Sequence, residues 1–198
     1  MIKNKWLIFN KLLFLIIILH IIGCEDAPSS VMIKEYGIVI NEINYNSSDQ
    51  FNSGDWIEIY NNSVDTIDIG LWIIKDNKDD HIFTIPINTN IAPEDYLIFC
   101  SDFSLFNSVF PGIDIFFDDL DFGLSGGSDA IRIFNNLGYL VDIVEYEDSS
   151  PWPSNSDGSG STLELIHPSR DNSQSNNWKD SIGNGTPGSL NSVFNIDG

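Results

Sequence analysis

The feature that most constrains the fold is a succession of short, β-branched segments separated by turn residues. Segment 55–60 alternates with period two, which places Glu58 and Tyr60 on one face and Ile57 and Ile59 on the other. Similar apolar or alternating segments lie at residues 37–45, 66–69, 70–74, 81–85, 96–100, 129–134, 139–146 and 162–166. We find no amphipathic helical pattern of useful length. Many short strands with turns about every 8 to 12 residues predict an all-β sandwich.

The middle of the chain allows two interpretations. Residues 101–110 form either a helical turn or a loop, with Phe103, Phe106 and Phe110 turned inward. Residues 113–117 are expected to form a further strand.

The first residues have the pattern of a secretory signal peptide. Lys3, Lys5 and Lys11 give a basic start, and residues 12–22 are then almost wholly apolar. A transmembrane helix needs about 20 apolar residues, so this run is too short to span a bilayer comfortably. We expect residues 1–23 to be a signal peptide.

The end of the apolar run, Ile21-Ile22-Gly23-Cys24, resembles the bacterial lipobox. The resemblance implies cleavage after Gly23, diacylglycerol on the Cys24 sulfur and an acyl chain on the new amine, which together hold a protein firmly to a membrane. Residues 24–35 would form a polar tether, and the expected location is the outer membrane or cell surface. The alternative is an uncleaved N-terminal anchor in which Cys24 is incidental.

Lipid on Cys24 would leave no second thiol in the chain to form a disulfide with Cys100. Cys100 ends the apolar run 96–100, and nothing nearby in the sequence would activate it as a nucleophile. We therefore expect it to be a small buried side chain.

The charge balance is strongly acidic, with 29 Asp and Glu against 9 Lys and Arg and a net charge of −20. Such a charge repels nucleic acid and anionic lipid headgroups, and nucleic acid is therefore excluded as a partner. It favours solubility and attracts divalent cations. A solvated acidic surface without a specific partner explains the same composition.

The order of motifs resembles the lamin tail domain, an immunoglobulin-like sandwich. The likeness is carried by IVINEI at 38–43, DWIEIYN at 55–61, GLWIIKD at 70–76, FTIP at 83–86 with IAP at 91–93 and YL at 96–97, STLEL at 161–165, NW at 177–178 and GTPGSLN at 185–191. The resemblance implies a domain over residues 36–191, followed by a tail at 192–198. It supplies no catalytic residues, and fold alone does not imply function.

Candidate chemistry is sparse. His81 and His167 have no neighbouring metal-ligand motif, so zinc is not expected. Glu42 and Glu58 recur in the strand motifs of the family, and we expect them to bond the backbone or to cover a sheet edge rather than to act as an acid–base pair. An enzyme that uses its surface carboxylates is the remaining alternative.

Calcium is the one candidate cofactor. Asp76, Asp79 and Asp80 share one predicted hairpin tip, and a second loop contains Asp118, Asp119 and Asp121. Calcium takes six to eight oxygen ligands from such loops, although neither loop has the spacing of an EF-hand. Solvated turn acids are the alternative explanation of both clusters, and we favour it over a calcium site.

Trp152 is the candidate ligand contact. It lies between two prolines in a polar loop, where an exposed indole could anchor a partner.

These observations predict a non-catalytic binding or adhesion module on the cell envelope, with an envelope protein or a polysaccharide as ligand. The alternative is an accessory component that acts in trans with an extracellular hydrolase or nuclease system.

Overall fold

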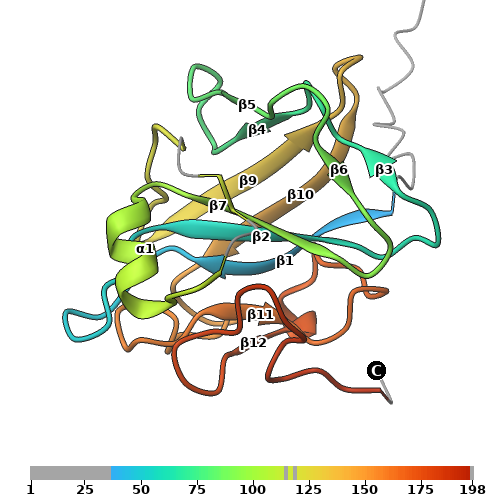
Figure 1. Cartoon of the computed structure of the whole chain (residues 1–198). Helices are drawn as coiled ribbons and strands as arrows, with labels where there is room; N and C mark the ends of the chain where they lie inside the picture. Colours follow the sequence, from blue (N-terminus) through green and yellow to red (C-terminus); the bar gives the residue numbers. More distant parts are fainter. Residues whose placement is uncertain (1–36, 114–115, 118–119, 197–198) are drawn as a thin grey trace, which may run out of the picture. The chain divides into compact units, whose positions relative to one another are not determined.

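The computed structural model describes residues 37–113, 116–117 and 120–196, which form two main sheets (Figure 1). The predicted signal peptide, Cys24 and the tether lie outside these residues, as do Asp118 and Asp119. The larger sheet has the strand order β12-β11-β1-β2-β7-β8. Its strands are β1 (Ile38–Asn44), β2 (Trp56–Asn61), β7 (Tyr96–Cys100), β8 (Phe116–Phe117), β11 (Leu163–Leu165) and β12 (Trp178–Asp180).

The second sheet has the order β10-β9-β4-β5. It comprises β4 (Ile73–Lys75), β5 (Phe83–Thr84), β9 (Ser128–Phe134) and β10 (Leu140–Glu147), and all its pairings are antiparallel. A small pair, β3 (Ile67–Asp68) and β6 (Asn90–Ile91), completes the strands, and a 3-10 turn (Ser175–Asn177) precedes β12. The predicted all-β sandwich is confirmed.

The core lies between the two sheets, because the period-two alternation of each strand sends one set of apolar side chains inward. Ile57 and Ile59 of β2 and Phe99 of β7 contribute from the larger sheet. Ile131 and Ile133 of β9 contribute from the smaller one. All five side chains are at most 1% exposed, so this face is a closed apolar layer.

The outer face of the larger sheet is also covered, at one end by the helix α1 (Phe103–Val109) (Figure 1). The Asp102 side chain caps the helix by accepting a hydrogen bond from the Leu105 backbone N–H at 3.0 Å. Phe106 then packs its ring edge-on to Trp56, with centroids 5.8 Å apart. Cys100 lies fully buried in this second apolar cluster, as expected.

The helix settles the ambiguity over residues 101–110 in favour of a helical turn, with Phe106 buried as expected; the inward orientation expected for Phe103 is wrong, because this side chain is 36% exposed. The strand expected at 113–117 is described at Phe116–Phe117, where it pairs parallel to β7. Among the described residues, no helix has the length and apolarity needed to cross a membrane.

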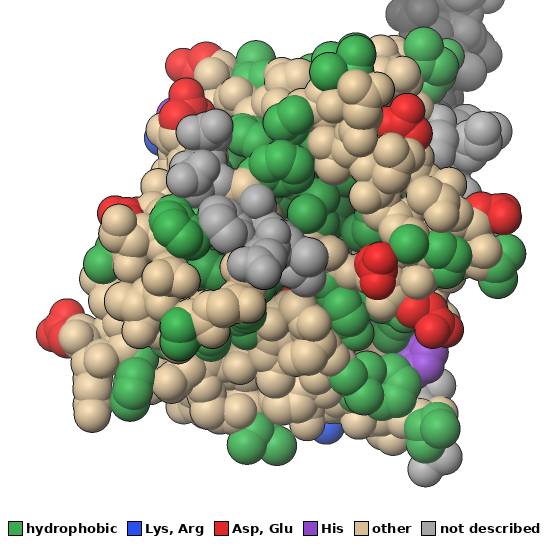
Figure 2. Space-filling view, viewed as in Figure 1, with side chains coloured by type: hydrophobic (Ala, Val, Ile, Leu, Met, Phe, Trp, Pro, Cys, Tyr) green, Lys and Arg blue, Asp and Glu red, His purple; other side chains and the backbone are tan. Residues whose placement is uncertain are grey.

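The described surface is acidic and poor in cations. Figure 2 shows carboxylates scattered around one face, with very few basic side chains among them.

Candidate functional site

Three glutamates form a row across the outer face of the larger sheet. Glu164, Glu42 and Glu58 lie on the adjacent strands β11, β1 and β2, and Glu42 is in register with both of the others. All three residues are 0% exposed. Like charges at directly opposite positions repel, and a buried carboxylate is costly unless it is hydrogen-bonded.

A β-bulge in β1 produces this alignment. The register between β1 and β2 shifts between Ile40 and Glu42, and Asn41 is the extra residue. The shift lets Ile40 and Ile43 both join the core while Glu42 takes the outer face opposite Glu58. Bulges re-aim side chains in this way.

Hydrogen-bond donors from the C-terminal segment, residues 185–193, satisfy the row. The Thr186 backbone N–H donates to Glu42 at 3.0 Å, and the Gly188 N–H donates to Glu58 at 2.6 Å. Glu164 accepts bonds from the Thr186 hydroxyl, the Ser192 hydroxyl and the Val193 N–H, at 2.7, 2.7 and 3.0 Å. The row therefore holds the C-terminal segment against the sheet.

Two further donors come from the strand side. The Thr162 hydroxyl donates to Glu42 at 2.5 Å, and the Asn41 amide donates to Glu58 at 2.8 Å. Gly185 approaches so closely that a Cβ built on it would lie 2.6 Å from a Glu42 oxygen, and its φ is +106°. Glycine has no Cβ and adopts a positive φ without strain, so it fits both the close approach and the backbone conformation at this position.

Burial raises the pKa of two members of the row. It raises the pKa of Glu58 to about 8, against the lowering effect of the bonds from Gly188 and Asn41. The pKa of Glu42 is raised well above its usual value by burial, and then by the charges of Glu58 and Glu164. Near neutral pH the row therefore retains protons that exposed glutamates have lost.

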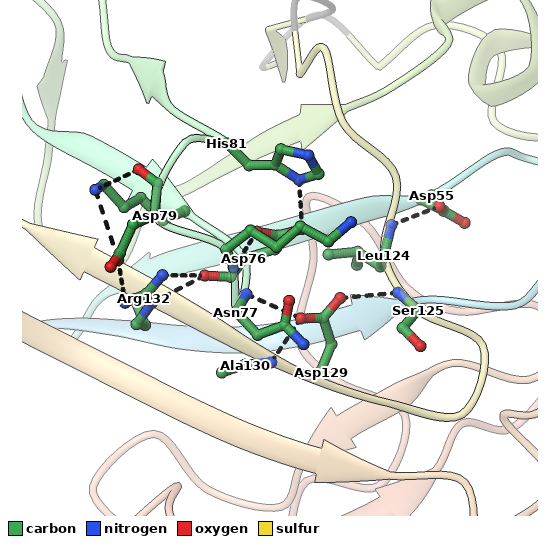
Figure 3. A network of polar contacts seen from close by, with 12 residues as sticks. Asp55, Asp76, Asn77, Asp79, His81, Leu124, Ser125, Asp129, Ala130 and Arg132 are labelled. Carbon is green, nitrogen blue, oxygen red and sulfur yellow. Dashed lines mark hydrogen bonds and ion pairs between the residues drawn. The ribbon is translucent and has the colours of Figure 1, made fainter.

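A second polar network joins the β4–β5 hairpin tip to the loop before β9 (Figure 3). The Asp76 carboxylate accepts a bond from the Lys78 N–H at 2.7 Å and lies 2.6 Å from His81 Nδ1. Arg132 donates two bonds to the Asp76 backbone carbonyl, at 2.8 and 2.6 Å, and pairs with Asp79 at 3.0 Å. These contacts brace the hairpin tip.

The same network continues through two more carboxylates. Asp129 accepts bonds from the Asn77 and Ser125 N–H groups at 3.0 and 2.8 Å. Asp55 accepts a bond from the Leu124 N–H at 2.8 Å, and burial, with a smaller contribution from the Asp129 charge, raises its pKa to about 6. Each of these acids is thus bonded to backbone donors of the loops.

The calcium candidates that the structure describes either have partners within the protein or face solvent. Asp76 is 2% exposed and faces His81, Asp79 pairs with Arg132, and Asp80 and Asp121 are exposed to solvent. Over residues 37–113, 116–117 and 120–196, no three His, Cys, Asp or Glu side chains lie together as a metal site would require.

The expectation that Trp152 is exposed is wrong. Its side chain is 8% exposed and belongs to the core, where it lies 6.1 Å from the Trp178 ring. The flanking prolines and polar residues suggested a surface loop, but this loop folds its indole inward. Trp152 is not available as a ligand contact.

Sequence reasoning missed Glu164 and the role of the C-terminal segment. The signal was present in the alternation Leu163-Glu164-Leu165, which turns Glu164 away from a core that holds both leucines. The segment also has many small, hydrogen-bonding residues.

Comparisons with known proteins agree with this architecture. The family model of the lamin tail domain matches residues 31–148. A DUF4876 family protein from Bacteroides thetaiotaomicron has a similar solved structure, with a TM-score of 0.52 at 12% identity, over 74% of this chain and 72% of that chain. At that identity the likeness concerns the fold. The search of curated proteins finds no match.

Proposed function

The chain belongs to the lamin tail domain family, and from this premise we propose that it displays a non-catalytic binding module on a bacterial cell envelope. In this proposal residues 1–23 direct export, lipid on Cys24 anchors the chain and the sandwich binds an envelope protein or polysaccharide.

One observation carries the non-catalytic part of the proposal. The three glutamates that could have served as acid–base groups are fully buried, and their oxygens accept bonds from the protein's own donors. A general acid or base must reach the proton it transfers. Glu42, Glu58 and Glu164 instead fasten the C-terminal segment.

The anchoring part is supported by the N-terminal sequence. A basic start, a short apolar run and a small residue before Cys24 fit the requirements of signal cleavage and thiol lipidation. The acidic module would then face solvent beyond a polar tether, where its charge favours solubility over association with lipid headgroups.

Mass spectrometry of the mature N-terminus tests the anchor. We expect a chain that begins at Cys24 and carries acyl groups, whereas the Cys24→Ala variant should leave the membrane fraction or keep its signal peptide. An unmodified Cys24 on the wild-type chain would overturn the anchoring.

Binding and catalysis are tested on the full chain in detergent. We expect retention of purified envelope protein or polysaccharide and no turnover of glycosidase or phosphoesterase substrates. Turnover abolished by Glu58→Gln would refute the non-catalytic assignment, and retention of neither envelope fraction would refute the binding assignment.

A further inference from the structure

A pocket of about 190 Å³ opens on the outer face of the larger sheet. Tyr60 and Tyr96, which form its aromatic wall, are cross-strand partners on β2 and β7. They lie at the opposite end of β2 from Trp56, the residue covered by α1. The pocket therefore occupies the part of this face that neither α1 nor the glutamate row fills.

The wall is aromatic and only half-buried. The rings of Tyr60 and Tyr96 are 4.9 Å apart and tilted by 44°. Facing residues add His167 and Phe194, which stack with centroids 5.1 Å apart. Among the described residues, neither tyrosine hydroxyl makes a hydrogen bond, and burial raises the pKa of Tyr96 to about 12. Both phenols are therefore available to a ligand.

The floor and rim are built from neutral amides. Asn41 and Asn191 are buried and bonded to each other at 2.9 Å, and Asn191 also donates to the Leu165 carbonyl at 2.8 Å. At the rim, the Asn62 amide group donates to the Pro168 carbonyl at 3.2 Å. These bonds use the donors of the buried Asn41 and Asn191 amides within the protein, so the amides form a rigid, neutral floor.

His167 contributes a donor. Its Nδ1 accepts a bond from the Ser169 N–H at 3.1 Å. In the neutral ring an accepting Nδ1 places the proton on Nε2.

The lining contains no Lys, Arg, Asp or Glu among the described residues. An anionic ligand would meet no cation there and would be repelled by the net charge of −20. A cationic ligand would be attracted by the same net charge but would meet no carboxylate in the lining with which to form an ion pair. The chemistry therefore selects a neutral ligand that has apolar faces for the rings and hydroxyl groups for the phenols and the imidazole.

We propose that this pocket binds one neutral sugar residue of an envelope polysaccharide. This inference deepens the proposed function and rests on it. Drug-sized ligands occupy pockets of roughly 300 to 1,000 Å³, so the smaller volume here suits one sugar ring. Asn62 and Pro168 also line an adjoining groove of about 880 Å³, which gives the next residues of a polymer a path.

Titration of the full chain in detergent with neutral disaccharides of glucose, galactose, mannose and N-acetylglucosamine tests the proposal. Saturation-transfer NMR and calorimetry supply the readouts, and a uronic-acid disaccharide supplies the anionic contrast. We expect at least one neutral sugar to bind, Tyr96→Phe to weaken it several-fold and Tyr96→Ala to weaken it at least tenfold. Tyr139→Ala, which removes a tyrosine that is 59% exposed outside the pocket, should bind as wild type.

Three outcomes would overturn the sugar site: no neutral sugar binds, only the uronic acid binds, or Tyr96→Phe and Tyr96→Ala both bind as tightly as wild type. Because Tyr96→Phe keeps the packing of the ring, a folding defect in Tyr96→Ala cannot hide the result. Retention of purified envelope protein together with failure of every sugar would refute this site alone. Failure to retain any envelope component would refute the proposed function as well.

Discussion

The buried glutamate row makes the stability of the sandwich fall as the pH rises through neutrality. The pKa of Glu58 is about 8 in the folded chain against an ordinary value of 4.5. Between these values the folded chain holds a proton that the unfolded chain has lost. The contribution of Glu58 to the free energy of unfolding is therefore largest below about pH 4.5. It declines from there until about pH 8.

The magnitude follows from the pKa difference, because each pH unit in this window changes the free energy of unfolding by about 1.4 kcal/mol per proton. From pH 6.5 to pH 8, Glu58 alone lowers stability by about 2 kcal/mol, because the folded chain holds a proton that the unfolded chain lacks; the decline flattens as the folded Glu58 itself ionises near pH 8. Glu42 acts in the same direction. Burial raises the pKa of Asp55 and of Asp142 to about 6. These two groups also lower stability as the pH rises, but mainly below pH 6.5.

Urea unfolding followed by tryptophan fluorescence at pH 6.5, 7.0, 7.5 and 8.0 measures the effect. The Glu58→Gln variant should flatten the decline, because it removes the titrating group and keeps the side-chain shape. Glu145→Gln is the matched control, since Glu145 is exposed on β10 and its loss should leave the slope unchanged. Stability that stays level or rises from pH 6.5 to 8, or a Glu58→Gln variant with the wild-type slope, would refute the reasoning.

Three further substitutions test the packing by urea unfolding. Gly185→Ala should cost more than about 2 kcal/mol, because it adds a clash with Glu42 to a strained positive φ. Gly183 also has a positive φ but lies in open space, so Gly183→Ala should cost only the backbone strain, about 1 kcal/mol. Equal losses in the two variants would contradict the contact between Gly185 and Glu42. Trp152→Ala should cost about 3 to 5 kcal/mol as a core truncation, and a loss below about 1 kcal/mol would mean that the indole is exposed. Arg132→Met should cost about 1 to 3 kcal/mol by removing the brace on the hairpin tip, and an unchanged midpoint would show that the brace is dispensable.

Local pattern was sufficient to predict most of the strands and their faces, but not β6 and β12. The alternation of residues 55–60 separates Ile57 and Ile59 from Glu58, and the structure keeps that separation. The sequence also contains the signals of helix α1, because Asp102 is a good N-cap and Phe103, Phe106 and Phe110 recur at helical spacing.

Burial of the outer face could not be predicted from local pattern. Whether Glu58 meets water depends on Gly188, which lies 130 residues further along the chain. The prediction for Trp152 failed for the same reason, because this loop residue packs against Trp178 on β12. Periodicity reports which side chains share a face, but the partner that covers the face is set by long-range contacts.

The position of the C-terminal segment has a consequence for biosynthesis. Residues 185–193 leave the ribosome after every strand of both sheets has been made. Until they emerge, Glu42, Glu58 and Glu164 lack the backbone donors of Thr186, Gly188 and Val193. Mutual repulsion of glutamates at directly opposite positions opposes the pairing of β11 with β1, so the larger sheet is fully stabilised only after this segment has been made.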